Sequence, residues 1–312
     1  MRPIFAFFAA ALLAAPLLRA QTASCATPGT DNAFLGIKTI RLWPGAAPQA
    51  KGDSCFDIPA LTWLAPRGNE AHGSAVVIFP GGGYAELAGD LEGREVADWF
   101  TAHGFQAFIL SYRLASHGYL LPVPLLDARR AIQTVRAHAA DYHIDPNRIV
   151  VAGFSAGGHL AALAGTQFIP GSPQAADPVE RVSSRPDFLV LGYPWIGAIS
   201  NDTASLSYCK MYRLPMDQCE ALRLKYSADL DVTQETPPTF IYHTFNDRTV
   251  PVEQSLRFFE AMVKAGVPAE YHVFANGAHG SGLGKGDPAL DMWPKLLENW
   301  LRAQGLMPAK KP

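Results

Sequence analysis

Ser155 is the residue whose surroundings most clearly indicate chemistry. It is the centre of a G-x-S-x-G pattern, Gly153-Phe154-Ser155-Ala156-Gly157, which follows the β-branched run Ile149-Val150-Val151 and precedes the helix-compatible segment Ala156–Ala164. In a strand–turn–helix context this pattern holds a serine hydroxyl on a strained turn at a helix N-terminus, as a nucleophile requires. The alternative is a serine in a glycine-rich loop that binds phosphate. Because strand and helix both flank the motif, the pattern favours a nucleophile.

Two further polar residues follow later strands. Asp247 comes after the apolar run Thr239–Phe245, and His279 lies in the glycine-rich loop Ala275–Gly280. A histidine oriented by a carboxylate can take the proton of an attacking serine. The alternatives are an Asp247 that only caps a turn, with Asp229 or Asp231 as the acid, and a structural histidine. The order serine, acid, histidine along the chain favours a catalytic triad of Ser155, Asp247 and His279.

A third element is Pro80-Gly81-Gly82-Gly83-Tyr84, directly after the apolar run Ala75–Phe79. Consecutive glycines let a backbone curl until several N–H groups point at one position, as stabilisation of an oxyanion requires. A flexible loop or a phosphate cradle is the alternative, but the Gly-Lys-Ser/Thr of a P-loop is missing.

Alternating strands and helices must position these residues. This alternation predicts an α/β fold with a mostly parallel central sheet, helices on both faces and two N-terminal edge strands. Asp127, Arg129 and Arg130 are expected on a solvated or ion-paired helix face. Strands are expected at Phe34–Trp43, Ile58–Ala65, Ala75–Phe79, Gln106–Tyr112, Ile149–Gly153, Phe188–Tyr193, Thr239–Asp247 and Glu270–Phe274. Helices are expected at Leu91–His103, Pro124–His138, Ala156–Ala164, Glu253–Ala265 and Asp291–Leu301.

The length and composition fit a single catalytic domain. The chain has 312 residues, of which 48% are hydrophobic, and a net charge of −2 without a basic run, so no nucleic-acid partner is expected. We expect a signal peptide over residues 1–20, an N-terminal extension with edge strands over 21–72, a catalytic domain over 73–305 with a cap or insertion at 194–236, and a tail at 306–312.

The N-terminus resembles an export signal. Arg2 precedes the apolar stretch Ile4–Leu18, and small residues follow, so cleavage is expected near Ala20. The expected location is periplasmic or secreted, without a membrane span after cleavage. A permanent anchor, or lipidation at Cys25, is the alternative.

The four cysteines, Cys25, Cys55, Cys209 and Cys219, can pair in an oxidising compartment. The shortest loops are closed by Cys25–Cys55 and Cys209–Cys219; other connectivities and four free thiols are the alternatives. Their spacing matches no zinc pattern, so no metal is expected.

Short motifs lie between Ala75 and Trp300, at Pro80–Tyr84, Gly89–Gly93, Tyr112–Leu114, Pro124–Ala131, Gly153–Leu160, Arg185–Phe188 and Gly277–Gly280. Together they resemble the bacterial acetyl esterase and xylan esterase group of α/β-hydrolases, which is also described as feruloyl-esterase-like. The resemblance implies hydrolysis of short acyl esters, typically acetyl groups on plant polysaccharides, without a cofactor. It implies a Ser155–Asp247–His279 triad and oxyanion donors at the N–H groups of Gly82, Gly83 and Ala156. The sequence departs from the family between Ile196 and Glu220.

Aromatic residues near these motifs are expected to contact the substrate. Tyr84, Tyr193 and Trp195 are the predicted substrate-binding residues, and Tyr208, Met211 and Tyr212 could narrow the acyl side of the site. A sugar-stacking platform that faces solvent is the alternative. Two other functions compete: an exported serine peptidase of the prolyl-oligopeptidase type, which shares fold and triad, and a non-catalytic binding protein. The sequence does not predict an oligomeric state.

Overall fold

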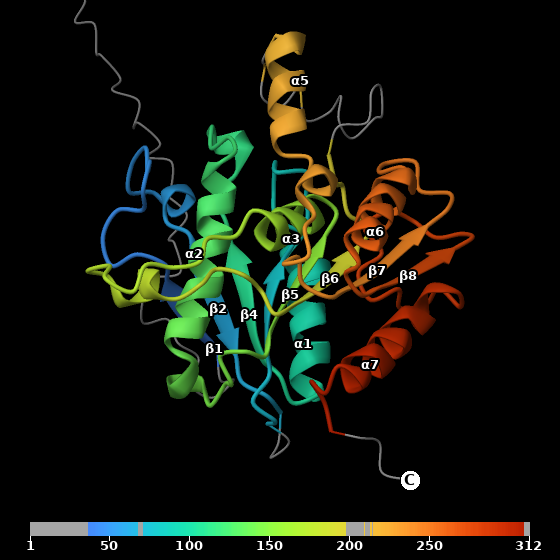
Figure 1. The fold of residues 1–312 in the computed structure, drawn as a ribbon, viewed down its shortest axis with the longest axis horizontal. Helices are drawn as coiled ribbons and strands as arrows, with labels where there is room; N and C mark the ends of the chain where they lie inside the picture. The colour runs from blue at the N-terminus through green and yellow to red at the C-terminus, as the bar shows by residue number, and fades with distance from the viewer. Residues whose placement is uncertain (1–36, 68–70, 198–208, 210–212, 214, 309–312) are drawn as a thin grey trace, which may run out of the picture.

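The protein is described from a computed structural model that covers residues 37–67, 71–197, 209, 213 and 215–308. Its centre is an eight-stranded sheet in the order β1-β2-β4-β3-β5-β6-β7-β8 (Figure 1). β1 and β2 pair antiparallel and lie at one edge, while β4, β3, β5, β6, β7 and β8 run parallel to one another, as predicted. The strands are β1 Ile37–Arg41, β2 Ala60–Leu64, β3 Ala75–Phe79, β4 Gln106–Ser111, β5 Ile149–Phe154, β6 Phe188–Gly192, β7 Thr239–Thr244 and β8 Ala269–Phe274.

Helices cover both faces of the sheet and form two hydrophobic cores. α2 (Val123–Ala137), α3 (Ala156–Thr166) and α6 (Glu253–Ala265) contribute to one core, and α1 (Glu95–Ala102) and α7 (Trp293–Ala303) to the other. The central strands β3 and β5 are buried along their whole length because both faces are covered. This explains their unbroken apolar sequences. Short 3-10 turns lie at Cys55–Asp57, Ala115–His117, Ala139–Tyr142, Pro178–Arg181, Ala228–Asp231 and Leu290–Met292.

Two expectations about element ends are wrong. The helix predicted from Leu91 is preceded by a π-helical segment, Gly89–Arg94, and becomes α-helical only at Glu95. Leu306 and Met307, expected in a tail, are buried in the core with α1 and α7. The carbonyl of Leu306 also accepts a hydrogen bond from Ser74 Oγ, at 2.9 Å.

The predicted charged face of α2 is ion-paired rather than solvated. The Asp127 side chain is fully buried, and its carboxylate accepts two hydrogen bonds from the Arg113 guanidinium and one from the Arg113 backbone N–H. Burial raises the pKa of Asp127, although the Arg113 hydrogen bonds oppose that shift. Arg130, also buried, donates to Asp177 and to the Leu42 carbonyl, while the half-buried Arg129 donates to the Gln167 carbonyl. Periodicity placed these residues on one side of a helix but could not show that the N-terminal segment covers that side.

The segment after β6 contains α5 (Met216–Lys225), which stands above the body of the molecule in Figure 1. The predicted Cys209–Cys219 disulfide is present and ties α5 to the segment before it. Cys55 is disulfide-bonded, but Cys25 lies outside the described residues, so the Cys25–Cys55 pairing stays a prediction. The predicted signal peptide, with its alternatives, also lies outside them.

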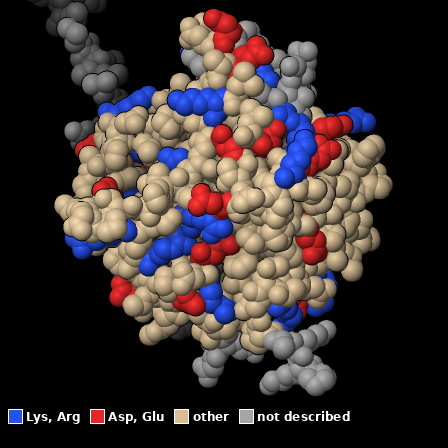
Figure 2. Space-filling model, in the orientation of Figure 1, with Lys and Arg blue, Asp and Glu red and all other residues tan. Residues whose placement is uncertain are grey.

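Positive and negative side chains are interspersed on the face seen in Figure 2. In the part of the chain that the structure describes, no helix is both long and apolar enough to span a membrane.

Candidate active site

Ser155 lies on the turn between β5 and α3. Its backbone has φ 52° and ψ −118°, a region that costs a non-glycine residue about 1–3 kcal/mol. Two hydrogen bonds hold this conformation: the Ser155 N–H donates to the Gly192 carbonyl at 3.0 Å, and the Ser155 carbonyl accepts from the Trp195 N–H at 3.1 Å. The strained turn predicted from the motif is therefore fixed by the last residue of β6 and by the segment that follows it.

The two glycines of the motif are required by close approach. A Cβ on Gly153 would lie 2.3 Å from the Gly157 carbonyl oxygen, and one on Gly157 would lie 2.0 Å from the Phe79 carbonyl oxygen. Atoms that are not bonded cannot approach so closely. The absence of side chains here lets α3 begin directly against the end of β3.

The structure brings Ser155, His279 and Asp247 together. His279 Nε2 lies 2.8 Å from Ser155 Oγ, and His279 Nδ1 lies 2.6 Å from Asp247 Oδ2. With a proton on Nδ1, the imidazole donates to the carboxylate and presents Nε2 as the acceptor for the serine hydroxyl proton. This is the geometry of a general base beside a nucleophile.

Asp247 is anchored on both of its oxygens. Oδ1 accepts hydrogen bonds from the N–H groups of Thr249 and Val250, at 2.8 and 2.9 Å, while Oδ2 faces His279 and, at 3.3 Å, Nε2 of the buried His243. Burial alone would raise the pKa of this carboxyl, but hydrogen bonds from His243 and His279 outweigh burial and hold the pKa well below its usual range. Asp247 is therefore a carboxylate at neutral pH. His243 therefore contacts the same carboxylate oxygen as His279. The sequence placed His243 inside a strand and did not indicate this contact.

The other candidate acids are occupied elsewhere. Asp229 accepts from Ser227 Oγ at 2.7 Å and forms an ion pair with Arg257, while Asp231 accepts from Gln167 Nε2 at 2.7 Å. Neither carboxylate contacts His279 in the structure.

The glycine turn after β3 lies beside Ser155. A Cβ on Gly81 would lie 2.9 Å from Ser155 Cβ, and the Gly81 N–H is already occupied, because it donates to Glu92 Oε2 at 2.7 Å. Within the described part of the chain, the N–H groups of Gly82, Gly83 and Ala156 have no hydrogen-bond partner. Gly82 has φ 117°, so the turn requires glycine at this position.

The three predicted substrate-binding aromatics are packed into the framework instead of facing an open pocket. Tyr84 and Tyr193 are 1% exposed and Trp195 is 4% exposed. Tyr84 OH is hydrogen-bonded to His159 Nδ1, and Tyr193 OH donates to Glu92 Oε1 at 2.8 Å. Their role is therefore support for the site, and direct contact with a substrate would require their side chains to move. Tyr208, Met211 and Tyr212 lie outside the described residues.

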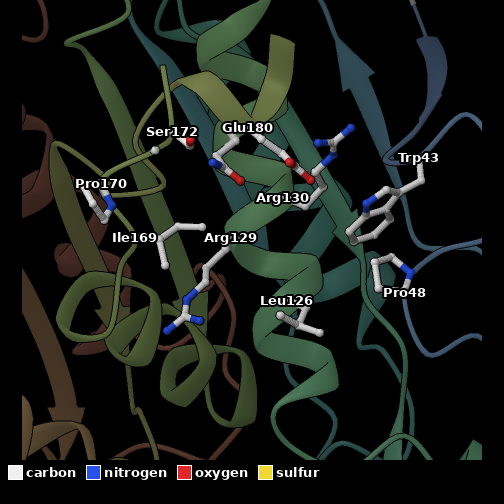
Figure 3. Close-up of a pocket in the computed structure, with 11 residues that line it drawn as sticks. Trp43, Pro48, Leu126, Arg129, Arg130, Ile169, Pro170, Ser172 and Glu180 are labelled. Atoms are coloured by element: carbon white, nitrogen blue, oxygen red, sulfur yellow. The ribbon is translucent and has the colours of Figure 1, made fainter. Parts of the chain in front are cut away.

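A cavity of about 450 Å³ lies on the surface of α2, away from the triad. Figure 3 shows Trp43 and Pro48 on one side of α2 and Pro170 and Ser172 on the other. None of the residues around Ser155 lines it. Among the described residues, no cluster of three histidine, cysteine or acidic side chains could hold a metal ion.

Two family profiles match the chain. BD-FAE matches residues 62–170, which include the glycine turn and Ser155, and the prolyl oligopeptidase family matches residues 199–303, which include Asp247 and His279. Both matches are consistent with a serine hydrolase site.

Solved and curated relatives point to ester hydrolysis. The crystal structure of an acetyl ester-xyloside bifunctional hydrolase from Caldicellulosiruptor lactoaceticus has a TM-score of 0.79 and 40% identity, covering 87% of this chain and 97% of that one. An acetylxylan esterase from Xylanibacter ruminicola is 32% identical over 77% of this chain and 47% of its own length. Endo-1,4-beta-xylanase B from Butyrivibrio fibrisolvens is 34% identical over 66% of this chain and 32% of its own length. The chain thus spans a third to a half of these two curated relatives.

Proposed function

The chain belongs to the BD-FAE family of α/β-hydrolases, and on that premise we propose that it hydrolyses short acyl esters, most readily acetyl esters on plant-cell-wall carbohydrate such as xylan. The observation that carries the proposal is the continuous hydrogen-bonded chain from Ser155 Oγ through His279 to Asp247. The names of the relatives, an acetylxylan esterase and an acetyl ester-xyloside hydrolase, support acetyl groups on xylose-containing substrates.

The mechanism follows from the geometry. Ser155 Oγ attacks the ester carbonyl while its proton passes to His279 Nε2, and Asp247 stabilises the imidazolium that forms. The free N–H groups of Gly82, Gly83 and Ala156 donate to the oxyanion of the tetrahedral intermediate. His279 then protonates the leaving alcohol, and a water molecule repeats the sequence on the acyl-enzyme. In this mechanism Asp247 stabilises the positive charge on His279, and the backbone N–H groups stabilise the negative charge on the substrate oxygen.

The acyl preference is tested with p-nitrophenyl esters. We expect kcat/KM for the acetate to exceed that for the butyrate by at least about tenfold, which is about 1.4 kcal/mol in transition-state binding, with the octanoate barely turned over. Release of acetate from acetylated xylan is measured in parallel. Ser155→Ala is the control, since activity that survives it does not come from this site. A butyrate or octanoate optimum would contradict the acetyl preference but leave the serine esterase intact.

A peptidase is the second candidate function, because the prolyl oligopeptidase profile matches residues 199–303. It is separated from the esterase by assaying prolyl p-nitroanilides and p-nitrophenyl acetate with the same preparation. Amide cleavage that disappears in Ser155→Ala and rivals ester cleavage would favour the peptidase.

Export is part of the proposal. It is supported by the apolar stretch Ile4–Leu18 and by the Cys209–Cys219 disulfide, since disulfides persist in oxidising compartments. N-terminal sequencing of the mature protein should begin at Gln21. An intact N-terminus on protein that stays with the cytoplasmic fraction would overturn this part.

A further inference from the structure

Glu92 is a buried carboxylate beside the triad that the mechanism above does not use. It lies in the π-helical segment Gly89–Arg94, and only 2% of its surface is exposed. Oε2 accepts a hydrogen bond from the Gly81 N–H at 2.7 Å, and Oε1 accepts one from Tyr193 OH at 2.8 Å. A buried charge is costly unless it is hydrogen-bonded, so these two contacts are what allow the carboxylate to remain here.

The first contact reaches the glycine turn. Gly81 immediately precedes Gly82 and lies against Ser155, since a Cβ on Gly81 would be 2.6 Å from Glu92 Oε2 and 2.9 Å from Ser155 Cβ. The hydrogen bond from the Gly81 N–H to Glu92 fixes the Pro80–Gly81 peptide. The next two peptides carry the N–H groups of Gly82 and Gly83, so Glu92 holds the turn directly before these donors. The turn is otherwise closed by its own carbonyls, with Gly82 O accepting from Ala85 and Glu86 N–H groups.

The second contact reaches the histidine loop. Tyr193 OH donates to Glu92 and accepts from the Gly282 N–H at 2.9 Å, and the Tyr193 ring meets the His279 ring edge-on with centroids 4.9 Å apart. The Gly282 carbonyl accepts from Tyr242 OH and from Trp293 Nε1, so the loop is held on both sides. Tyr193 has a strained φ of 35°, which these contacts must stabilise.

We propose that Glu92 is a positioning residue. Through its contacts with the Gly81 N–H and with Tyr193, it holds the glycine turn and the His279 loop in a fixed position relative to each other. The proposal rests on the proposed function, because it assumes that these two loops serve one reaction. A carboxylate suits the task because it can accept at both oxygens, whereas an amide has a single acceptor atom. Burial raises the pKa of Glu92, while the hydrogen bonds from Tyr193 and Gly81 and the charge of His279 favour the ionised form. A negative charge near His279 also stabilises the imidazolium of the transition state.

Glu92→Gln is the test, since it keeps the shape of the side chain but removes one acceptor and the charge. We expect kcat for p-nitrophenyl acetate to fall at least about tenfold, with KM within about twofold, because the oxyanion contacts are stronger in the transition state than in the ground state. The affinity for a trifluoromethyl ketone, which forms a tetrahedral adduct with the serine, should fall by the same factor as kcat/KM. Asp90→Asn is the matched control: it makes the same charge change on an exposed side chain of the same segment and should leave both readouts unchanged.

Tyr193→Phe separates positioning from general stability. It breaks the link to Glu92 and Gly282 without changing a charge, and its loss in kcat should not add to that of Glu92→Gln, since both variants break one chain of contacts. Fully additive losses would contradict the proposal, and so would a Glu92→Gln enzyme whose kcat stays within about twofold of wild type. A variant that only raises KM and lowers the melting temperature would make Glu92 merely structural. Inactivity of the wild-type enzyme on every ester would instead overturn the proposed function.

Discussion

Two histidines, His159 and His279, lie close to the nucleophile turn, and they differ in burial and in the charge of their hydrogen-bond partners. His159, one helical turn after Ser155 on α3, is fully buried, with Nδ1 against Tyr84 OH at 2.9 Å and Nε2 against the Tyr226 carbonyl at 2.7 Å. His279, on the loop after β8, is partly exposed and lies between Ser155 Oγ and the Asp247 carboxylate.

The comparison shows what a histidine needs to move a proton. The contacts of His159 are a neutral hydroxyl and a neutral carbonyl, and burial lowers the pKa of His159 to about 4, so it remains neutral. His279 has a carboxylate on one side, which stabilises the imidazolium, and a nucleophile on the other. His159 therefore packs the nucleophile turn, and His279 can serve as a base.

The matched substitutions His279→Gln and His159→Gln test this difference most strongly. We expect His279→Gln to lose about 10⁵-fold or more in kcat because the triad acts as a unit, while its melting temperature changes little. A glutamine at position 159 can keep both hydrogen bonds, so kcat of His159→Gln should stay within about tenfold of wild type. The main effect of this substitution should be a lower melting temperature. Comparable kinetic losses in the two variants would remove the distinction.

Asp247→Asn changes only the partner that distinguishes His279 from His159. An amide can donate to Nδ1 and so favour the wrong tautomer, and we expect kcat to fall about 10⁴-fold in a folded protein. Asp229→Asn is the control, because that carboxylate pairs with Arg257. Near-normal activity of Asp247→Asn together with an inactive Asp229→Asn would mean that the acid is misassigned.

The pH dependence of the free energy of unfolding tests whether His159 stays neutral in the folded protein. In the unfolded chain this imidazole takes up a proton below about pH 6.5, whereas in the folded protein its pKa is about 4. Between these values the unfolded state binds more protons, so the contribution of His159 to stability is complete above pH 6.5 and falls, by up to about 3 kcal/mol, as the pH drops towards 4.

Urea unfolding of wild type and His159→Gln at pH 8, 6 and 4.5 measures this effect as the difference between the two proteins. The difference cancels the carboxyl groups that titrate in the same range, such as Glu92 and Asp187, whose pKa values burial raises. A difference that does not change with pH would show that His159 does not remain neutral in the folded state.

Ser155 and Asp247 could be predicted because each follows a strand with a clear apolar run, and His279 because it lies in a glycine-rich loop after the last predicted strand. Parallel strands bring their C-terminal ends to one edge of the sheet, so the order of Ser155, Asp247 and His279 was enough to place them together. The helix Glu253–Ala265 was predicted with its observed bounds, since Gly266 ends a clear amphipathic pattern.

Contacts between distant segments could not be predicted in this way. Glu92 was part of a recognised motif, but its partner Tyr193 is 101 residues away, and periodicity cannot pair them. Tyr193 was assigned to the substrate for the same reason, because an aromatic residue after a strand is indistinguishable in sequence from one that packs beneath the site. An aspartate on an amphipathic helix is typical of a surface residue, and the sequence alone could not show that Arg113 pairs with Asp127 in the interior.

The contact between Gly157 and the Phe79 carbonyl has a consequence for the evolution of new specificities in the laboratory. Because a single methyl group at position 157 would collide with the main chain of β3, even Gly157→Ala should be absent from any library selected for activity. Selectable variation must therefore accumulate at a distance from the serine. α5, which stands above the body of the molecule and is tied to the segment before it by Cys209–Cys219, carries no residue of the triad or the glycine turn, so substitutions on its exposed side chains leave the catalytic geometry intact.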